Sequence, residues 1–461
     1  MKFKVKSLKF KVVAALISVA ATEAVVAQSN NTASNFSFSL QQAIDYAMQN
    51  QTKVLNAGYD EQIAQNKVKE IKGIGLPQIN GSIDAKSFLN IPVQGVPSAN
   101  FPFPGTPAAD GVAYLKFGVP YSSSFGVDAT QLLFDGTYIV GLQATKVYLD
   151  LSKKSSQRTK IETSVAVTKA YYTVLLNDER MKLMDANVSR LKKLMDDTKA
   201  LYDNGFVEKL DFDRITVTYN NIVVEKEKIQ RFIDLGNALL KYQMGMDQNA
   251  SLTVTDKIED IKFDSGNLSA EKFDYSKRVE YSLVQDQNTT AKLQLKKDRY
   301  SYLPNMVMYG TTSMNKFIPA LDNATLTQHW FPTTIIGAKI GIPVFDGFQK
   351  HYRIQQSKLT LLKSDNDLKF MQQSIDLEMY STRTTLLNSS SSLEVQKKNI
   401  EMAEDVYRVA KLKYDQGVGS NLEVLNSETA LKEAQTNYYN ALYDALIAKV
   451  DYERATGAIV K

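Results

Sequence analysis

One long block occurs twice in this chain, and the duplication limits the possible folds more than any other feature. Each copy begins with Phe-Asp-Gly at the end of an apolar strand and closes at a glycine, Gly245 in the first copy and Gly457 in the second. Phe345 follows Phe134 by 211 positions and Gly457 follows Gly245 by 212, so the copies slip by a single position. Such a period is too long for a solenoid unit and predicts an internally duplicated chain.

Very long helices are expected within each copy. The 461 residues include 11 prolines and 22 glycines, which favours few and long elements. The segment 137–201 would be roughly 100 Å long at the helical rise if the helix is continuous. Apolar residues step by three and four along these runs, which is the spacing of a coiled coil. The clearest series is Leu431, Ala434, Tyr438, Ala441, Ala445, Ala448 and Tyr452.

Two segments in each copy alternate with a period of two, the pattern of a strand with one apolar and one wet face. In the first copy they lie at 78–86 and from about 123 to 134, separated by a Pro-, Gly- and Phe-rich loop at 90–121. In the second copy, 335–344 alternates clearly and 306–312 poorly. Leu76-Pro77 and Leu303-Pro304 precede the first strand of each copy at an offset of 227 positions. Because the Phe-Asp-Gly motifs are offset by only 211 positions, the loop of the second copy is shorter.

Residues 1–27 have the features of a secretory signal peptide, so we expect the mature chain to start at Gln28. Five lysines precede an apolar stretch at 12–21, and Val25-Val26-Ala27 suits cleavage. Removing this segment lowers the formal net charge from +5 to +1, and no nucleic-acid footprint remains. Cys is absent, which fits an exported protein and leaves no acceptor for a lipid anchor, so a lipoprotein is not expected. Beyond residue 27 no run of 18 uncharged apolar residues occurs.

Four units are expected along the chain: a signal peptide at 1–27, a first repeat at 28–246, a connector at 247–276 and a second repeat at 277–461. Ser39 and Gln42 form a capping box, which predicts a helix that runs, with a break near Asn50-Gln51, to about Gly73. The connector should hold a short strand around Thr253 and a capped helix start.

The strands and helices together predict the assembly. Alternating strands cross a membrane only as a closed barrel, and four strands per chain cannot close one. Three copies would give twelve strands, an even number with room for a channel. The expected fold is mainly α with a membrane β-barrel, a trimeric duct whose helices far exceed the roughly 30 Å hydrocarbon layer. A soluble sandwich for the strands, or a fibrous coiled coil for the helices, is the alternative.

Short motifs in both copies carry a family resemblance through their order, spacing and duplication. They are Ser39-Leu40, Gln42-Ala43-Ile44, Leu76-Pro77, Phe134-Asp135-Gly136, Tyr202 to Gly205, Leu303-Pro304, Phe345 to Gly347, Tyr414 to Gly417 and Leu422-Glu423-Val424-Leu425. Over nearly all of the mature chain the pattern resembles the TolC-like outer membrane efflux proteins. The resemblance implies a homotrimer in a Gram-negative outer membrane, with a periplasmic α-helical barrel. It also implies an exit duct that serves an inner-membrane transporter or a type I secretion machine through a periplasmic adaptor protein.

The strand alternation assigns side chains to two faces. In a barrel, wet-face residues should point into the lumen and apolar-face residues toward outer membrane lipid. The wet-face residues are Asp84, Lys86, Asp128 and Lys339, and the apolar-face residues are Phe125, Val127, Ile336, Ile340 and Ile342.

Two Gly-containing turns interrupt the long helical runs and should form the periplasmic tip. The stretch from Phe134 to Tyr202 and the stretch from Phe345 to Tyr414 differ in length by a single position, so both hairpins should reach the same distance from the membrane. The candidate residues of this gate are Tyr202, Gly205, Asp211, Asp213, Arg214, Tyr414, Gly417, Glu423 and Asn426.

In the resembled family this tip docks the adaptor, and polar bonds between hairpins hold it shut. By position Asp211 and Tyr414 match one such pair, whereas Glu423 and Asn426 match two acidic positions at the entrance. Asn426 is not acidic and Gly419 replaces a basic latch residue, so the entrance should be less tightly latched and less cation-selective. The alternative is that Asp211 caps a helix and Tyr414 packs against its neighbours.

Catalytic chemistry finds little support in the sequence. His329 and His351 are the only histidines, Cys is absent, and no Gly-rich phosphate cradle occurs. Asp211 and Asp213 form a carboxylate pair beside Arg214, but a capped helix start accounts for them equally well. We therefore expect no enzyme, cofactor or metal site. A stand-alone porin would show many strands and few helices, and an adhesin would show a passenger domain.

Overall fold

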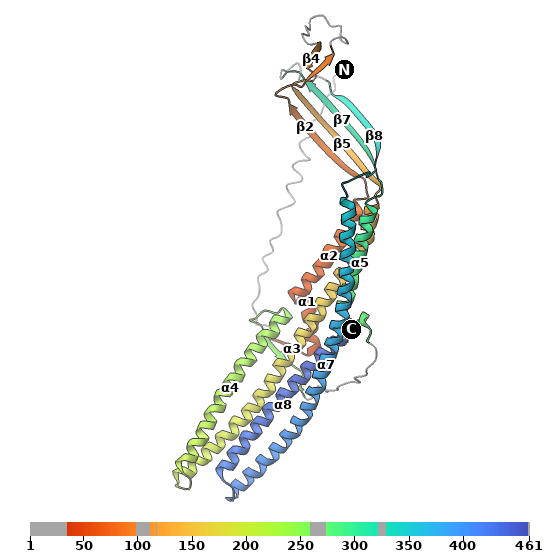
Figure 1. The fold of residues 1–461 in the computed structure, drawn as a ribbon. Helices are drawn as coiled ribbons and strands as arrows, with labels where there is room; N and C mark the ends of the chain where they lie inside the picture. Colours follow the sequence, from red (N-terminus) through yellow and green to blue (C-terminus); the bar gives the residue numbers. More distant parts are fainter. Residues whose placement is uncertain (1–34, 98–110, 117, 259–272, 321–328, 460–461) are drawn as a thin grey trace.

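The computed structural model describes residues 35–97, 111–116, 118–258, 273–320 and 329–459. The chain is strongly elongated, with a four-stranded sheet at one end and a helical body that ends in two hairpins at the other (Figure 1). Helices α3 (Gly136–Asp203) and α7 (Gln349–Asp415) run from the sheet to the hairpin tips. The expected signal peptide lies outside the described residues.

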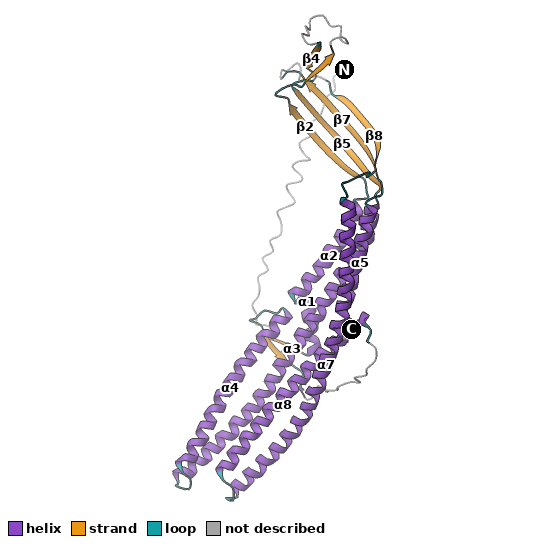
Figure 2. Cartoon of the chain, in the orientation of Figure 1, coloured by secondary structure: helices purple, strands orange, loops and turns teal. Residues whose placement is uncertain are grey.

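The elements follow the duplicated order, and helix dominates as predicted (Figure 2). The first part of the chain contributes β1 (Asn35–Phe38), α1 (Leu40–Asn50), α2 (Thr52–Gly73), β2 (Gln78–Ser87), β3 (Val93–Pro97), β4 (Val112–Lys116), β5 (Tyr121–Phe134), α3 and α4 (Lys209–Met244). The second part contributes β6 (Ser251–Val254), the 3₁₀ helix η3 (Tyr275–Lys277), α5 (Val279–Tyr300), β7 (Asn305–Ile318), β8 (Phe331–Gly341), α7 and α8 (Asn421–Thr456).

Local signals set the helix starts. Ser39 and Gln42 form the predicted capping box of α1. The Asp135 carboxylate accepts hydrogen bonds from the backbone N–H groups of Thr137 at 2.7 Å and Tyr138 at 3.0 Å, which begins α3 directly after β5. A capping carboxylate of this kind satisfies N–H groups that have no partner within the helix.

The break between α1 and α2 falls at Gln51, as predicted. Its side-chain amide donates to the carbonyl oxygens of Tyr242 and Gln243 at the end of α4, both at 3.0 Å. The end of α4 is thereby tied to the middle of the molecule, where α1, α3 and α4 share a core that includes Ala47, Tyr171 and Leu240.

The sheet has the order β2-β5-β7-β8 and is antiparallel throughout. Within the described residues, β2 and β8 each pair on one side only. The sheet edges therefore present backbone N–H and C=O groups without ladder partners in the protomer.

The second copy departs from expectation at the end of its last strand. The sequence alternation runs to Val344, but β8 ends at Gly341. Pro343 has no N–H to donate to a ladder and so cannot continue the strand. Gly347 and Phe348 then both adopt left-handed backbone, each with φ 65°, before α7 begins. In the first copy α3 begins immediately after Asp135, without such a turn. We therefore place the one-residue difference in spacing between the copies at the Gly347-Phe348 turn.

Three short strands were not predicted. The expected loop at 90–121 contains the hairpin of β3 and β4, and β1 pairs in parallel with β6, the strand expected in the connector. Strands as short as these offer too few positions for a period of two to stand out.

A second core lies nearer the tips and joins the two hairpins. It contains Leu191 and Leu194 of α3, Ile215 and Ile222 of α4, and Val424 of α8. Among the helices that the structure describes, none combines the length and apolar character that crossing a membrane requires.

Candidate functional site: the sheet faces and the helical tip

The strand register brings the four predicted lumen residues onto one face of the sheet. They are Asp84, Lys86, Asp128 and Lys339. Asp128 of β5 pairs with Asn80 of β2, and Asn80 lies on the same side of β2 as Asp84 and Lys86. Asp128 also pairs with Thr311 of β7. Val307 lies on the same side of β7 as Thr311 and pairs with Lys339 of β8. Since side chains alternate along a strand, all four project from the same side.

Polar contacts on this wet face leave its charges accessible. Lys86 and Asp84 form an ion pair at 3.1 Å, with side chains 59% and 46% exposed. The Thr311 hydroxyl donates to Asp128 at 2.6 Å, and Lys339 is exposed. Exposed ion pairs contribute little to stability, so these groups remain free to interact with ions in solution.

The opposite face of the sheet is apolar. Phe125 lies between Ile83 of β2 and Met314 of β7, and Ile340 lies opposite Met306. Ile336 is 74% exposed in the protomer, and Val127 and Ile340 are exposed too. Ile342 lies beyond the end of β8, so the strand register does not assign its side chain to this face. A contiguous exposed apolar surface of this kind marks contact with lipid or with another protein.

Each hairpin at the helical tip turns in the same way. Gly205 and Gly417 adopt left-handed backbone, with φ 78° and 73°. The N–H of the following residue then donates to a carbonyl oxygen in the last turn of the helix, Phe206 to Leu201 and Val418 to Lys413. This is the Schellman ending of a helix, which favours glycine because a Cβ is strained at positive φ. It explains why a glycine recurs at both turns.

The predicted gate residues of the first hairpin gather at the start of α4. Asp211 lies 3.7 Å from Arg214 one helical turn on, and Asp213 is exposed. Tyr202 stacks on Phe212 with ring centroids 6.2 Å apart, which braces α3 against α4 at the turn. Asp211 lies in the first turn of α4, where a negative charge is favourable.

Tyr414 packs into the tip-side core, and its hydroxyl is buried without a hydrogen-bond partner among the described residues. Lys411 lies over its ring, 5.2 Å from the centroid. The predicted bond to Asp211 is therefore not made in the protomer. The structure does bring Tyr414 and the first hairpin together, because the same core contains Leu194 and Ile215.

The remaining predicted tip residues line a groove of about 1110 Å³ between α7 and α8. Glu423 and Asn426 lie on its α8 side, and Lys413 of α7 approaches Glu423 at 3.3 Å. A Cβ on Gly419 would come within 2.9 Å of the Tyr414 backbone nitrogen, so this turn has no room for a side chain there. The cation nearest the entrance carboxylate is thus Lys413, which the sequence did not single out.

A buried polar seam between α3 and α8 was also missed. Asn187 donates to Gln435 at 3.2 Å, and Arg190 contacts both Asn187 and Glu428, the latter at 3.2 Å. Burial raises the pKa of the Glu428 carboxyl above its ordinary value, and Arg190 and Tyr407 partly oppose the shift. The sequence signal for this seam was the occurrence of polar residues within helices of coiled-coil spacing. Only the packing of α3 against α8 shows that these residues contact one another.

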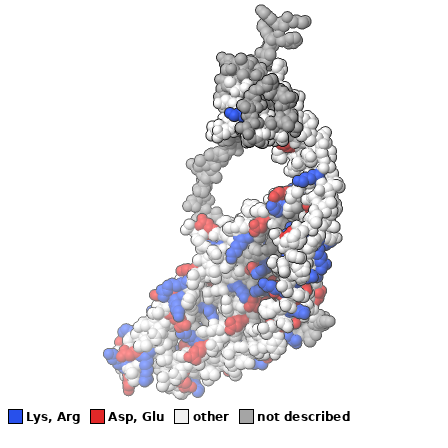
Figure 3. Space-filling model, turned by 45° about the horizontal axis from the view of Figure 1, so that its top comes forward, with Lys and Arg blue, Asp and Glu red and all other residues white. Residues whose placement is uncertain are grey.

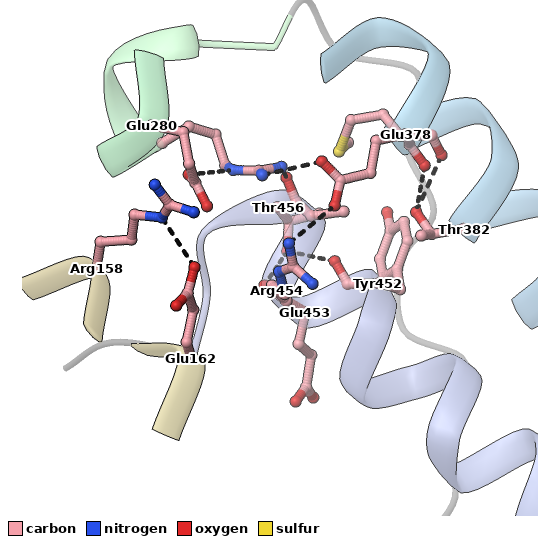
Figure 4. Close-up of polar contacts among 12 residues, drawn as sticks. Arg158, Glu162, Glu280, Glu378, Thr382, Tyr452, Glu453, Arg454 and Thr456 are labelled. Atoms are coloured by element: carbon pink, nitrogen blue, oxygen red, sulfur yellow. Dashed lines mark hydrogen bonds and ion pairs between the residues drawn. The ribbon is translucent and has the colours of Figure 1, made fainter. Parts of the chain in front are cut away.

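A second polar cluster joins α5, α7 and α8 midway along the body (Figure 4). The buried Arg278 binds Glu280 at 3.0 Å and Glu378 at 2.9 Å, and it donates to the Ala455 carbonyl oxygen at 2.9 Å. Arg454 approaches Glu378 from α8. Figure 3 shows that charges of both signs mingle over the visible helical surface, without a single-sign patch. Among the described residues no group of three or more His, Cys, Asp or Glu could hold a metal ion.

Comparisons with known proteins agree with this geometry. A model of the family described as "Outer membrane efflux protein" matches residues 294–458. Outer membrane protein TolC of Salmonella enteritidis is 20% identical over 347 residues, which covers 73% of this chain and 69% of that protein. The alkaline protease secretion protein AprF of Pseudomonas aeruginosa is 23% identical over 158 residues, 34% of this chain and 32% of that protein.

A solved structure shares the fold over nearly the whole length. The outer membrane protein VceC of Vibrio cholerae superposes with a TM-score of 0.69 at 16% identity, covering 91% of this chain and 96% of that one. The fold and these similarities define the class as an outer membrane efflux channel. The family that this chain resembles is that of the TolC-like outer membrane efflux proteins, which are ducts rather than enzymes.

Proposed function

We propose that three copies of this chain form a channel-tunnel that exports small molecules or proteins from the periplasm across the outer membrane. The observation that carries the proposal is the sheet itself. It has a wet and an apolar face, both of its edges are unpaired among the described residues, and it continues into helices whose fold is shared with VceC. Four strands cannot close a barrel, whereas twelve strands from three copies enclose a channel.

Exposed apolar side chains along the helices support association of several copies. On α7 they recur from the sheet toward the tip, and α4 carries a shorter stripe of the same kind. Such surfaces on long helices favour packing against another copy, because contact removes apolar area from water. The α7 stripe includes Tyr352, Leu359, Phe370, Leu377, Tyr380, Val395 and Met402, and the α4 stripe includes Val217, Val224, Leu235 and Tyr242.

The wet sheet face would line the channel, and the hairpin turns would form its periplasmic entrance. The resemblance to the TolC-like family supports docking of an adaptor protein with an inner-membrane transporter at this tip. AprF is named for alkaline protease secretion, which supports including proteins as well as small molecules among the exported substrates. A tunnel of this kind makes few specific contacts with its cargo, so its sequence carries little substrate information.

Two measurements test the proposal on the full mature chain. In mild detergent we expect a particle of about three times the mature mass that dissociates on boiling, and in planar bilayers we expect that particle to conduct ions. A stable monomer, or a trimer that does not conduct, would contradict the proposal.

A further inference from the structure

The duplication extends to the register of the strands. Gln78 of β2 pairs with Thr130 of β5. Their counterparts in the second copy, Asn305 at an offset of 227 and Gly341 at an offset of 211, pair with each other in β7 and β8. At the other end of the ladder, Ser87 pairs with Tyr121, and their counterparts Met314 and Pro332 pair as well. The two strand pairs are therefore the same structure repeated without a shift.

The helical joint repeats in the same way. A Cβ on Gly245 would meet the Asn50 carbonyl oxygen at 2.6 Å, and one on Gly457 would meet the Lys277 oxygen at 2.7 Å. Asn50 and Lys277 are again 227 positions apart. Gly245 and Gly457 are 212 positions apart, one more than the strand partners, because the spacing between the repeats increases by one position after the Phe-Asp-Gly motifs. With that one-position change, two independent sites repeat the same contacts, so a contact between the first and second repeats can be used to derive its counterpart between chains.

Within the chain, the last strand of the first repeat pairs with the first strand of the second. Asp128 of β5 lies opposite Thr311 of β7, and the two side chains are hydrogen-bonded. If several chains form a ring in which first and second repeats alternate, the equivalent contact joins β8 of one chain to β2 of the next chain. At the same offsets, Lys339 is the equivalent of Asp128 and Asp84 is the equivalent of Thr311.

Resting on the proposed trimer, we infer that β8 pairs antiparallel with β2 of a second copy in the register that sets Lys339 opposite Asp84. The two groups carry opposite charge, lie on the same wet face and are exposed in the protomer. On the apolar face the register sets Ile340 opposite Ile83, which are 56% and 90% exposed in the protomer. Directly opposite residues of antiparallel strands interact through their side chains.

Neighbouring registers fit less well. A slip by one position would place Lys339 opposite Ile83 or Ala85 and mix the wet and apolar faces. A slip by two would place it opposite Lys86, a like charge, or opposite Ser82. The derived register is thus favoured by charge as well as by the repeat. In this register Asp84 would contact Lys339 of the neighbouring chain, either in place of Lys86 or together with it.

Cysteine cross-linking tests the register, because the chain has no cysteine of its own. One chain carries Lys339→Cys and a differently tagged chain carries Asp84→Cys, and the two are co-expressed. Within one chain β2 and β8 are separated by two strands, at a spacing of about 4.8 Å per strand, so a disulfide must join two chains. We expect an oxidant-dependent covalent heterodimer that reductant abolishes.

Matched controls pair Lys339→Cys with Ser82→Cys or Lys86→Cys, both on the same face of β2. We expect little cross-linking from either, because each lies two positions from the derived partner. If an assembly of trimer mass forms but a control pair cross-links more than the Asp84 pair, or no pair cross-links, the register is wrong. If no oligomer forms even with the native sequence, the proposed trimer itself fails.

Discussion

At the scale of single residues, Tyr414 shows how much a side chain depends on its setting. Its ring is packed in the tip-side core, and its hydroxyl is buried without a partner among the described residues. A buried hydroxyl left unpaired costs about 1–3 kcal/mol. The predicted latch to Asp211 would relieve that cost in an assembled, closed tip, which gives the latch a physical rationale.

We predict that Asp211→Ala combined with Tyr414→Phe raises single-channel conductance without lowering trimer abundance. Removing the bond would free the entrance, whereas the core would keep an aromatic ring of the same shape. Thr198→Val is a matched control, because it removes another buried hydroxyl that lacks a partner among the described residues but belongs to no predicted latch. Unchanged conductance in the double variant, with trimers in normal amounts, would remove both residues from the gate.

Glu428 gives the tip half of the body a pH dependence. Burial raises the pKa of its carboxyl, so the folded chain holds this proton more tightly than the unfolded chain does. The resulting stability is fully present below the ordinary glutamate pKa of 4.5 and is lost as the pH rises through the raised value. We predict that Glu428→Gln, which cannot ionise, flattens the pH dependence of the urea midpoint across this window. A variant that keeps the slope of the native protein would contradict this account.

At the scale of elements, the ends of α4 and α8 are fixed by close backbone contact. Gly245 combines φ 72° with a carbonyl oxygen only 2.6 Å from where a Cβ would lie. We predict that Gly245→Ala lowers the free energy of unfolding by about 1–3 kcal/mol, from left-handed strain and the clash with Asn50. Gly141 lies inside α3 with nothing within 4 Å of its Cβ position, so Gly141→Ala should raise stability, by up to about 1 kcal/mol. Equal effects in denaturant titrations would show that the contact at Gly245 is unimportant.

The two faces of β8 should respond differently to charge. Ile340→Arg places a cation on the apolar face and should cost about 2–4 kcal/mol if the residue lies near the membrane midplane. Lys339→Glu should leave the assembly intact, because the backbone ladder remains and an exposed pair contributes only about 0.2–1 kcal/mol. It should instead alter ion selectivity in planar bilayers. The reverse ranking of trimer yields would show that the strand is out of register by one position.

At the scale of the whole molecule, the proposed trimer would cover both the exposed apolar stripes of the helices and the unpaired edges of the sheet. We predict that Leu377→Lys, on the exposed α7 stripe, reduces trimer abundance in detergent, because a charge replaces an apolar side chain that is 69% exposed in the single chain and that the proposed trimer would bury. Lys397→Gln, at an exposed position of α7 two residues after Val395 and therefore on the opposite side of the helix from the stripe, should leave trimer abundance unchanged. Equal trimer yields from the two variants would place the subunit contact elsewhere.

The sequence by itself determined the duplication, the helix starts at Ser39 and Asp135, the glycine turns at the tip and the two faces of the clearly alternating strands. These features are local, because caps, left-handed glycines and a period of two act through neighbours along the chain. Tertiary structure alone decided the parallel pairing of β1 with β6, the unpaired hydroxyl of Tyr414 and the contact of Arg190 with the distant Glu428. Those outcomes depend on which distant segments pack together, and packing selects partners by shape and burial that no spacing within one segment encodes.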